Sequence, residues 1–173
     1  RIQAGPRSEA YSYYAVADQF RWWGSQEVKS RAVVEDHARD SYENLLFSIC
    51  RFYEVTSKYP EHVTVVGFDF KKHRFEQLHR AAIKYPSSKF TYLGLKPTSP
   101  LFDYDHALDI EQRYSIDEFV RDPYGCSANI LVQKRVERNP FKHEIPYGLS
   151  CPQLKPLLSW CGPQTFDTQL PWE

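Results

Sequence analysis

The chain has 173 residues, of which 42% are hydrophobic, so it is long enough to form one compact domain with its own core. Its 22 lysine and arginine residues balance its 22 aspartate and glutamate residues, and this argues against capture of nucleic acid or an anionic membrane by a whole-molecule field. No stretch approaches the roughly 20 apolar residues that a membrane span needs, and the N-terminus lacks the apolar core of a signal peptide. The four cysteines form no CxxC motif, so we expect a cytoplasmic protein with reduced thiols.

The first part of the chain alternates between helical and strand periodicity. Apolar residues at helical spacing predict a helix over residues 8–24, and the β-branched run at 28–34 predicts a strand. A longer helix is predicted over residues 40–60, with Asp40 or Ser41 as its N-cap and a proline at its end.

Two further strands are predicted on either side of another helix. The run at 62–68 is apolar without alternation, which is typical of a strand covered on both faces in a parallel sheet. Residues 71–85 carry apolar side chains at i, i+3, i+4, i+7 and i+8 and predict a helix, and residues 89–95 predict the next strand. This order predicts an α/β fold with a parallel sheet in residues 1–95.

The first predicted helix has no strand before it. In an open α/β sheet a strand should lead into that helix, yet only seven residues precede Ser8. Since the chain begins with Arg1 and contains no methionine, we expect the first strand to lie upstream of Arg1.

Residues 96–173 are predicted to form an extension packed on the same domain. Ser115 and Glu118 would form a capping box, and Phe166 and Trp172 would pin the C-terminal tail. The predicted elements are a surface loop at 96–114, short helices at 115–123, 127–140 and 151–162, and an extended tail at 163–173.

Parallel sheets bind ligands beyond the carboxyl ends of their strands, where helix N-termini also point. The loops at these ends carry a mixed polar set that suits a polar ligand of either sign: Ser8, Glu9, Glu35, Asp40, Ser41, Asn44, Asp69, Lys71, Arg74 and Lys96. Capping of helices is the simpler reason for Ser8, Asp40 and Ser41.

Lys71 and Arg74 are harder to explain by local stability. They lie in the first turn of their predicted helix, where a cation opposes the helix dipole at a cost of about 0.3–1 kcal/mol. We therefore expect a bound anion or a facing carboxylate, with Glu9 and Glu35 as candidate partners. Simple solvation of exposed charges is the alternative.

No familiar motif indicates a reaction. The chain has no GxGxxG, GxxxxGK[ST], GxSxG or HExxH, and its six histidines show no metal-ligand spacing with cysteine, so no metal is expected. His79 falls on an apolar helical stripe and fits the core or its boundary, and Cys126 follows turn residues without a neighbouring base. The basic run at 134–142 fits a solvated helix face, with RNA binding as the alternative.

Three segments resemble a known family. Ser8-Glu9-Ala10 resembles the Ser-Glu-Ala element of the domain of unknown function shared by the bacterial envelope proteins SanA, YdcF and ElyC. Residues 35–44, EDHARDSYEN, are similar to that family's Glu-x-x-Ser-x-Asn-Thr-x-Glu-Asn motif. In this motif the identical residues are Glu35, Glu43 and Asn44, the similar ones are Asp40 and Ser41, and the departing one is Ala38.

The third segment, VVGFDFKKHR, resembles the family's strand followed by Thr-Ser-x-x-His-x-x-Arg. Arg74 matches, but Lys71 replaces the histidine and Gly67-Phe68 replaces Thr-Ser. The resemblance covers residues 5–95, and DPYGC and KRVERNPF look like the extension of the fungal members. It implies a Rossmann-like domain whose first strand lies upstream, and either S-adenosylmethionine or a nucleotide as a possible cofactor.

We therefore expect a cytosolic Rossmann-like protein that binds a small polar, anionic or nucleotide-like ligand at the strand ends. Lys71 and Arg74 would hold a phosphate or carboxylate, while Glu35 and Asn44 would orient a polar group. If the protein is an enzyme, transfer or hydrolysis is expected, with Glu9 and Glu35 as the catalytic carboxylates. The rival function is a non-catalytic interaction module that contacts a protein partner through the residues after Lys96.

Overall fold

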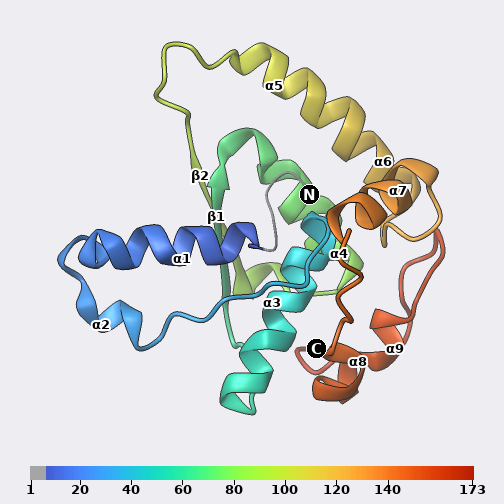
Figure 1. Ribbon diagram of the computed structural model, residues 1–173. Helices are drawn as coiled ribbons and strands as arrows, with labels where there is room; N and C mark the ends of the chain where they lie inside the picture. The colour runs from blue at the N-terminus through green and yellow to red at the C-terminus, as the bar shows by residue number, and fades with distance from the viewer. Residues whose placement is uncertain (1–6) are drawn as a thin grey trace.

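The computed structural model describes residues 7–173 and shows a mixed α/β arrangement, in which helices flank a small parallel sheet (Figure 1). The sheet consists of β1 (Val63–Phe68) and β2 (Phe90–Leu95), paired in parallel from Val63 opposite Phe90 to Phe68 opposite Leu95. Both strands agree with the sequence prediction. No helix of residues 7–173 combines the length and apolarity that crossing a membrane requires.

The first helix, α1 (Glu9–Gln19), begins where the sequence predicts. Ser8 is its N-cap and accepts a hydrogen bond from the backbone N–H of Tyr11. The strand predicted at 28–34 is wrong, because α2 (Gln26–Lys29) occupies its start and the rest pairs with no strand of the described chain. β-Branched residues favour a strand only where a partner edge accepts their backbone hydrogen bonds.

The helix predicted at 40–60 is confirmed as α3 (Ser41–Thr56). The Asp40 carboxylate accepts from the backbone N–H of Glu43 and caps the helix, so Asp40 rather than Ser41 is the N-cap. The buried stripe of α3 runs along Leu45, Leu46 and Ile49 and forms much of the core.

The connection between the two strands is helical, but it is not one regular helix. It consists of η3 (Asp69–Lys71), η4 (Arg74–His79) and α4 (Arg80–Ala82), followed by the turn η5 (Ser87–Lys89). The η4 segment is a π-helix, a wide turn that occurs frequently at functional sites.

The sheet buries only one of its faces. Its inner face, with Val65, Phe90 and Tyr92, packs on the core. Side chains of the outer face are exposed, at 62% for Val66, 51% for Leu93 and 59% for Leu95. The expectation of a strand covered on both faces is therefore wrong for the part of the chain that is described. The strand expected upstream of Arg1 is outside the chain, and residues 1–6 are outside the described part.

The loop predicted at 96–114 is confirmed as far as residue 103 and is wrong from residue 104 onward, where a continuous helical arm begins. It runs through α5 (Tyr104–Glu111), the π-helix η6 (Gln112–Ile116) and α6 (Asp117–Arg121). Asp103 caps this arm by accepting from the backbone N–H of His106. The predicted capping box is wrong, because Ser115 lies inside the helix rather than before its first turn.

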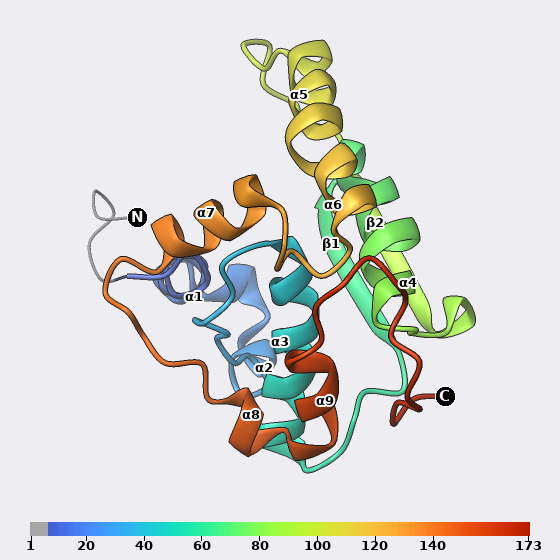
Figure 2. The same ribbon diagram turned by 90° about the vertical axis from the view of Figure 1, so that its right-hand side faces the viewer.

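The C-terminal part contains α7 (Asn129–Arg138), α8 (Tyr147–Ser150), η7 (Pro152–Leu154) and α9 (Lys155–Leu158), which confirms the helices predicted near 127–140 and 151–162. In Figure 2, α8 and α9 lie beside α3, and their buried residues join the same core. The tail is anchored as predicted: Phe166 and Trp172 are buried, and the Trp172 indole donates to the carbonyl of Ile83 at 3.0 Å.

The cysteines correct the expectation of four reduced thiols. Cys126 and Cys161 form a disulfide between the loop before α7 and the segment after α9, while Cys50 and Cys151 are free and buried. Cys126 is therefore not a free nucleophile.

Candidate functional site

A buried polar network lies between α3, η4 and the α5 arm. The Arg74 guanidinium donates through Nε and Nη2 to the two carboxylate oxygens of Glu111, at 2.6 and 3.0 Å. Its Nη1 donates to the Ser41 hydroxyl at 2.5 Å. Arg74 is 8% exposed and Glu111 is 5% exposed, so this two-point ion pair is shielded from water.

His79 extends this network into the core. Its Nε2 lies 2.8 Å from the Ser41 hydroxyl, which also accepts from Arg74, so one hydroxyl joins the two side chains. Burial, with the charges of Arg74 and Arg135, lowers the pKa of His79 well below its ordinary value. His79 is therefore neutral, and its buried Nδ1 has no partner among the described residues.

A second ion-pair group lies at the N-terminus of α3. Arg135 of α7 donates to the Asp40 cap at 2.6 Å and lies 3.3 Å from the Glu43 carboxylate. Arg39 also pairs with Glu43. Gly125 makes room for this group, since a Cβ there would lie 2.7 Å from the Arg135 guanidinium. These contacts join α7 to the start of α3.

Four cations lie on η3, η4 and α7, the elements around these networks, and we call Lys71, Arg74, Lys134 and Arg138 the cation site. Within residues 7–173, Arg74 alone of the four forms an ion pair. Lys134 donates to the carbonyl of Tyr114 at 2.5 Å, and Arg138 donates to the carbonyl of Arg39 at 2.9 Å. A carbonyl satisfies one donor but does not neutralise a positive charge.

The pKa shifts of the two lysines indicate which charges act on each of them. Burial lowers the pKa of Lys71, and the charges of Arg74 and Arg138 contribute. Burial also lowers the pKa of Lys134, again with contributions from Arg138 and Arg74. Carboxylates oppose these shifts: Glu111 and Glu9 raise the pKa of Lys71, and Glu118 and Asp40 raise the pKa of Lys134.

The structure unites some of the predicted site residues. Ser41 and Arg74 are in direct contact, and Lys71 lies at the carboxyl end of β1, where the strand-end rule placed it. Glu9 is exposed at the start of α1, and its negative charge partly opposes the lowering of the Lys71 pKa. The partner of Arg74 is neither Glu9 nor Glu35 but Glu111, a residue of the segment predicted as a loop.

Ser8 and Asp40 act as caps, and Asn44 lies on the exposed side of α3 without a side-chain hydrogen bond within the described chain. Ser8 also donates to the Asp36 carboxylate. The structure gives Asn44 no contact with Lys71 or Arg74.

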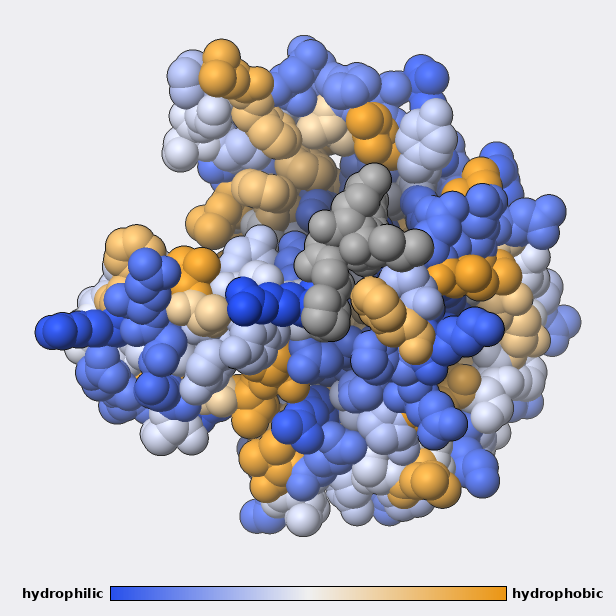
Figure 3. Space-filling view, viewed as in Figure 1, coloured by the Kyte–Doolittle hydropathy of each residue, from blue (hydrophilic) through white to orange (hydrophobic). Residues whose placement is uncertain are grey.

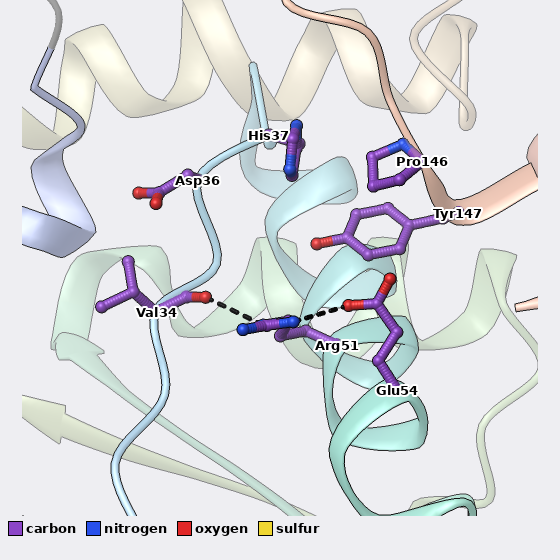
Figure 4. A pocket seen from close by; sticks show the side chains of 7 residues that line it. All are labelled: Val34, Asp36, His37, Arg51, Glu54, Pro146 and Tyr147. Atoms are coloured by element: carbon purple, nitrogen blue, oxygen red, sulfur yellow. Dashed lines mark hydrogen bonds and ion pairs between the residues drawn. The ribbon is translucent and has the colours of Figure 1, made fainter. Parts of the chain in front are cut away.

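Glu35 lies beside a different hollow, a cavity of about 220 Å³ (Figure 4). Its Oε1 accepts from the Tyr147 hydroxyl and from the backbone N–H of His37, both at 2.8 Å, and its Oε2 accepts from the backbone N–H of Ala38 at 3.1 Å. These bonds fit a carboxylate that holds a loop in place. Burial and the Glu35 charge raise the pKa of Tyr147, which keeps the hydroxyl protonated and donating.

The positive charge of Arg51 in this cavity is already paired with a carboxylate, as Figure 4 shows. Arg51 donates to the Val34 carbonyl at 3.2 Å and to Glu54 at 2.9 Å. The cavity is lined by Val34, Asp36, His37, Arg51, Glu54, Pro146 and Tyr147. Residues 7–173 contain no group of three or more histidine, cysteine or acidic side chains that could hold a metal ion.

Sequence reasoning missed Glu111, Arg135 and the contributions of Lys134 and Arg138. The basic run at 134–142 is the available signal, but its spacing alone also fits a solvated helix face. Leu131 of that helix is buried and Arg135 is held by Asp40, so one face of α7 packs on the domain.

Comparison with known proteins yields one relative of unassigned function. The chain is 38% identical over 121 residues to the uncharacterized protein YOR238W of Saccharomyces cerevisiae, covering 66% of this chain and 40% of that protein. No family model and no solved structure matches. The chain thus spans about 40% of the length of this fungal relative, and the similarity assigns no activity to either protein.

Proposed function

We propose that this protein binds a small phosphorylated ligand at the cation site. The observation that carries the proposal is that Lys71, Lys134 and Arg138 form no ion pair within residues 7–173, although they lie beside the buried Arg74–Glu111 pair. Several donors around one region suit an anion with several oxygens, such as a phosphate, better than a single carboxylate. Positive charge also favours a phosphate ester over S-adenosylmethionine, whose sulfonium and amino groups are cationic.

The proposal gives the predicted residues different tasks. Lys71, Lys134 and Arg138 would contact the anion, whereas Arg74 would position the site because Glu111 and Ser41 already engage it. Hydrogen bonds from lysine and arginine to a bound anion become stronger when water is excluded from the contact. If a transfer or hydrolysis reaction occurs at the bound phosphate, Glu9 is the exposed carboxylate that acts on Lys71, whereas Glu111 also acts on Lys71 but is buried and paired with Arg74.

We also propose that the fold is Rossmann-like and related to the SanA, YdcF and ElyC domain. The parallel pairing of β1 and β2, the helical connection between them and the position of Lys71 at the end of β1 support this proposal. Asp40 and Ser41 belong to the second segment that resembles this family. Asp40 caps α3, and Ser41 accepts a hydrogen bond from Arg74 of the cation site.

Calorimetric titration with inorganic phosphate and pyrophosphate tests ligand binding. Replacing Lys71 or Arg138 by glutamine should weaken pyrophosphate binding about tenfold or more, because each change removes a charged hydrogen bond. Lys72→Gln is the matched control, since Lys72 neighbours Lys71 but is exposed and lies 3.8 Å from Glu76. Absence of binding to the parent chain, or an equal loss in the control, contradicts the proposal.

A protein-interaction module is the second candidate, and the exposed outer face of the sheet favours it. Hydrophobic side chains gather over β2 and its connection to α5 in Figure 3. Val66, Leu93 and Leu95 are more than half exposed, and Leu101 is 94% exposed. An apolar surface of this kind commonly marks an interface.

Sedimentation of the purified chain over a range of concentrations tests this candidate for contact between copies. Leu93→Glu should abolish any concentration-dependent association. Leu149→Glu should leave it unchanged, because Leu149 is also exposed but lies on α8. Association that neither change affects, or a strictly monomeric chain, argues against self-association through this face.

A further inference from the structure

An aromatic platform adjoins the cation site. It consists of Phe68, Phe70, Phe102 and Tyr104, which come from the end of β1, from η3 and from the approach to α5. The Phe70 ring is nearly parallel to both of its phenylalanine neighbours, at 15° to Phe68 with centroids 5.5 Å apart and at 21° to Phe102 with centroids 6.0 Å apart. Tyr104 meets Phe70 edge-on at 81°.

The platform is separate from the hydrophobic core. None of its members is among the buried residues that form the core of the described chain, and Phe68 is 42% exposed. Aromatic rings usually stabilise a domain by burial, whereas here Phe68 is exposed and the other three rings are only half-buried. Their position is that of a ligand-contacting surface in a parallel α/β sheet.

Local contacts hold the platform in one geometry. The Tyr104 hydroxyl donates to the Asp69 carboxylate at 2.9 Å, and Asp69 lies between Phe68 and Phe70 in the chain. Gly94 of β2 allows the strand to approach this turn, because a Cβ there would lie 2.9 Å from the Asp69 Cα atom. A preorganised aromatic surface loses little conformational entropy when a planar group stacks on it.

Lys71 connects the platform with the cation site. Its Nζ lies 5.5 Å from the Phe68 ring centroid and 5.8 Å from the Phe70 ring centroid, in the range of cation–π contact. The same lysine experiences the charges of Arg74 and Arg138. A phosphate bound to Lys71 therefore holds whatever is esterified to it next to the aromatic rings.

We propose that the ligand is a nucleotide, with its phosphate at the cation site and its base stacked on the platform of Phe68, Phe70 and Phe102. This inference rests on the proposed function and adds the chemical class of the group that the phosphate carries. Stacking on an aromatic side chain tolerates every base, because each base has a π-face. The platform thus contributes affinity for a planar ring rather than selection of one base.

The test compares adenosine 5′-monophosphate with ribose 5-phosphate by calorimetric titration of the same chain. The two probes share the phosphate and the sugar and differ in the base. We expect adenosine 5′-monophosphate to bind about tenfold more tightly, within the range measured for base stacking. Phe70→Leu should abolish this difference and leave the affinity for ribose 5-phosphate within about twofold of the parent value.

Phe20→Leu is the matched control. Phe20 is 58% exposed and stacks on Trp23 with ring centroids 5.9 Å apart, but it lies at the end of α1, away from the platform residues in the chain. The control should retain the tenfold preference. Circular dichroism and thermal unfolding of both variants establish that each is folded.

The outcomes separate the two proposals. Equal affinities of the parent chain for both probes, or an equal loss of both in Phe70→Leu, overturn the nucleotide inference while phosphate binding stands. Failure of inorganic phosphate, ribose 5-phosphate and adenosine 5′-monophosphate to bind overturns both.

Discussion

The guanidinium of Arg74 and the carboxylate of Glu111 form a two-point ion pair across 37 residues of sequence, with each partner almost wholly buried. Glu111 ends α5 and Arg74 begins η4, so the pair ties the α5 arm to the helical connection of the sheet. Arg74 is the first residue of the π-helix η4, and Glu111 directly precedes the π-helix η6. Both helices therefore deviate from regular α-helical geometry at this contact.

Removing one partner of this pair should be costly. Glu111→Gln leaves the Arg74 charge buried without its counter-charge, and we expect the free energy of unfolding to fall by about 3–5 kcal/mol. Urea denaturation measures the change. Asp109→Asn breaks the exposed Asp109–Arg113 pair of the same arm and should cost less than about 1 kcal/mol. The double variant Arg74→Met/Glu111→Leu should lose less than the sum of its single changes, and additive losses would contradict the pairing.

Gly125 is expected to be intolerant of a side chain. Its φ of +64° lies in the left-handed region, and a Cβ would lie 2.7 Å from the Arg135 guanidinium and 3.1 Å from the Asp40 carboxylate. Gly125→Ala should therefore lower the free energy of unfolding by at least about 1–2 kcal/mol. Gly148→Ala is the control, because Gly148 has open space around its Cβ position and lies in α8. Equal behaviour of the two variants in thermal unfolding would exclude this account of Gly125.

His79 should make the fold sensitive to acid. Burial holds the pKa of His79 well below its ordinary value of 6.5. Below that pH, the unfolded chain binds a proton at His79 and the folded chain does not. The free energy of unfolding should consequently fall as pH drops below about 6.5, by about 1.4 kcal/mol per pH unit from this residue.

His79→Gln should reduce that slope by the same amount, whatever its effect at neutral pH. Denaturation curves between about pH 7 and pH 5 measure both slopes, and the other five histidines contribute equally to the two proteins. Parallel pH profiles for the parent and the variant would show that His79 does not cause the effect.

The lowered pKa of Lys71 implies a pH limit for anion binding. Because burial and the Arg74 charge favour the neutral amine, Lys71 loses its proton at a lower pH than an exposed lysine of pKa 10.5. Pyrophosphate affinity should therefore fall as pH rises from about 8 towards 10. Lys71→Arg should reduce this dependence, since arginine stays charged throughout the range and leaves only the Lys134 contribution, whereas Lys72→Arg should follow the parent. Superimposable affinity profiles for all three chains would refute a role of Lys71 in binding.

Local sequence signals were sufficient for the elements that depend on neighbours in the chain. The Ser8 and Asp40 caps and the apolar stripe of α3 predicted α1 and α3, and the apolar runs predicted β1 and β2. The strand-end rule also placed Lys71 and Arg74 at the edge of the sheet where the cations gather.

The errors arose where the outcome depends on distant partners. Residues 28–34 have strand composition but no edge to pair with in the described chain, and Cys126 and Cys161 are joined although 35 residues separate them. The α5 arm has an Asp103 cap, but the turn-forming residues before it obscured the helix.

The amino-acid sequence alone thus determined α1, α3, β1 and β2 and the loops that follow the two strands, because caps and periodicity act over a few residues. Tertiary structure decided which charges meet. Arg74 binds Glu111 rather than Glu9 or Glu35, and Arg135 binds Asp40, because α5 and α7 bring these residues from distant parts of the chain. Burial also decided that His79 is neutral and that Lys71 and Lys134 hold their protons less tightly, since desolvation depends on the packed fold and not on spacing in the chain.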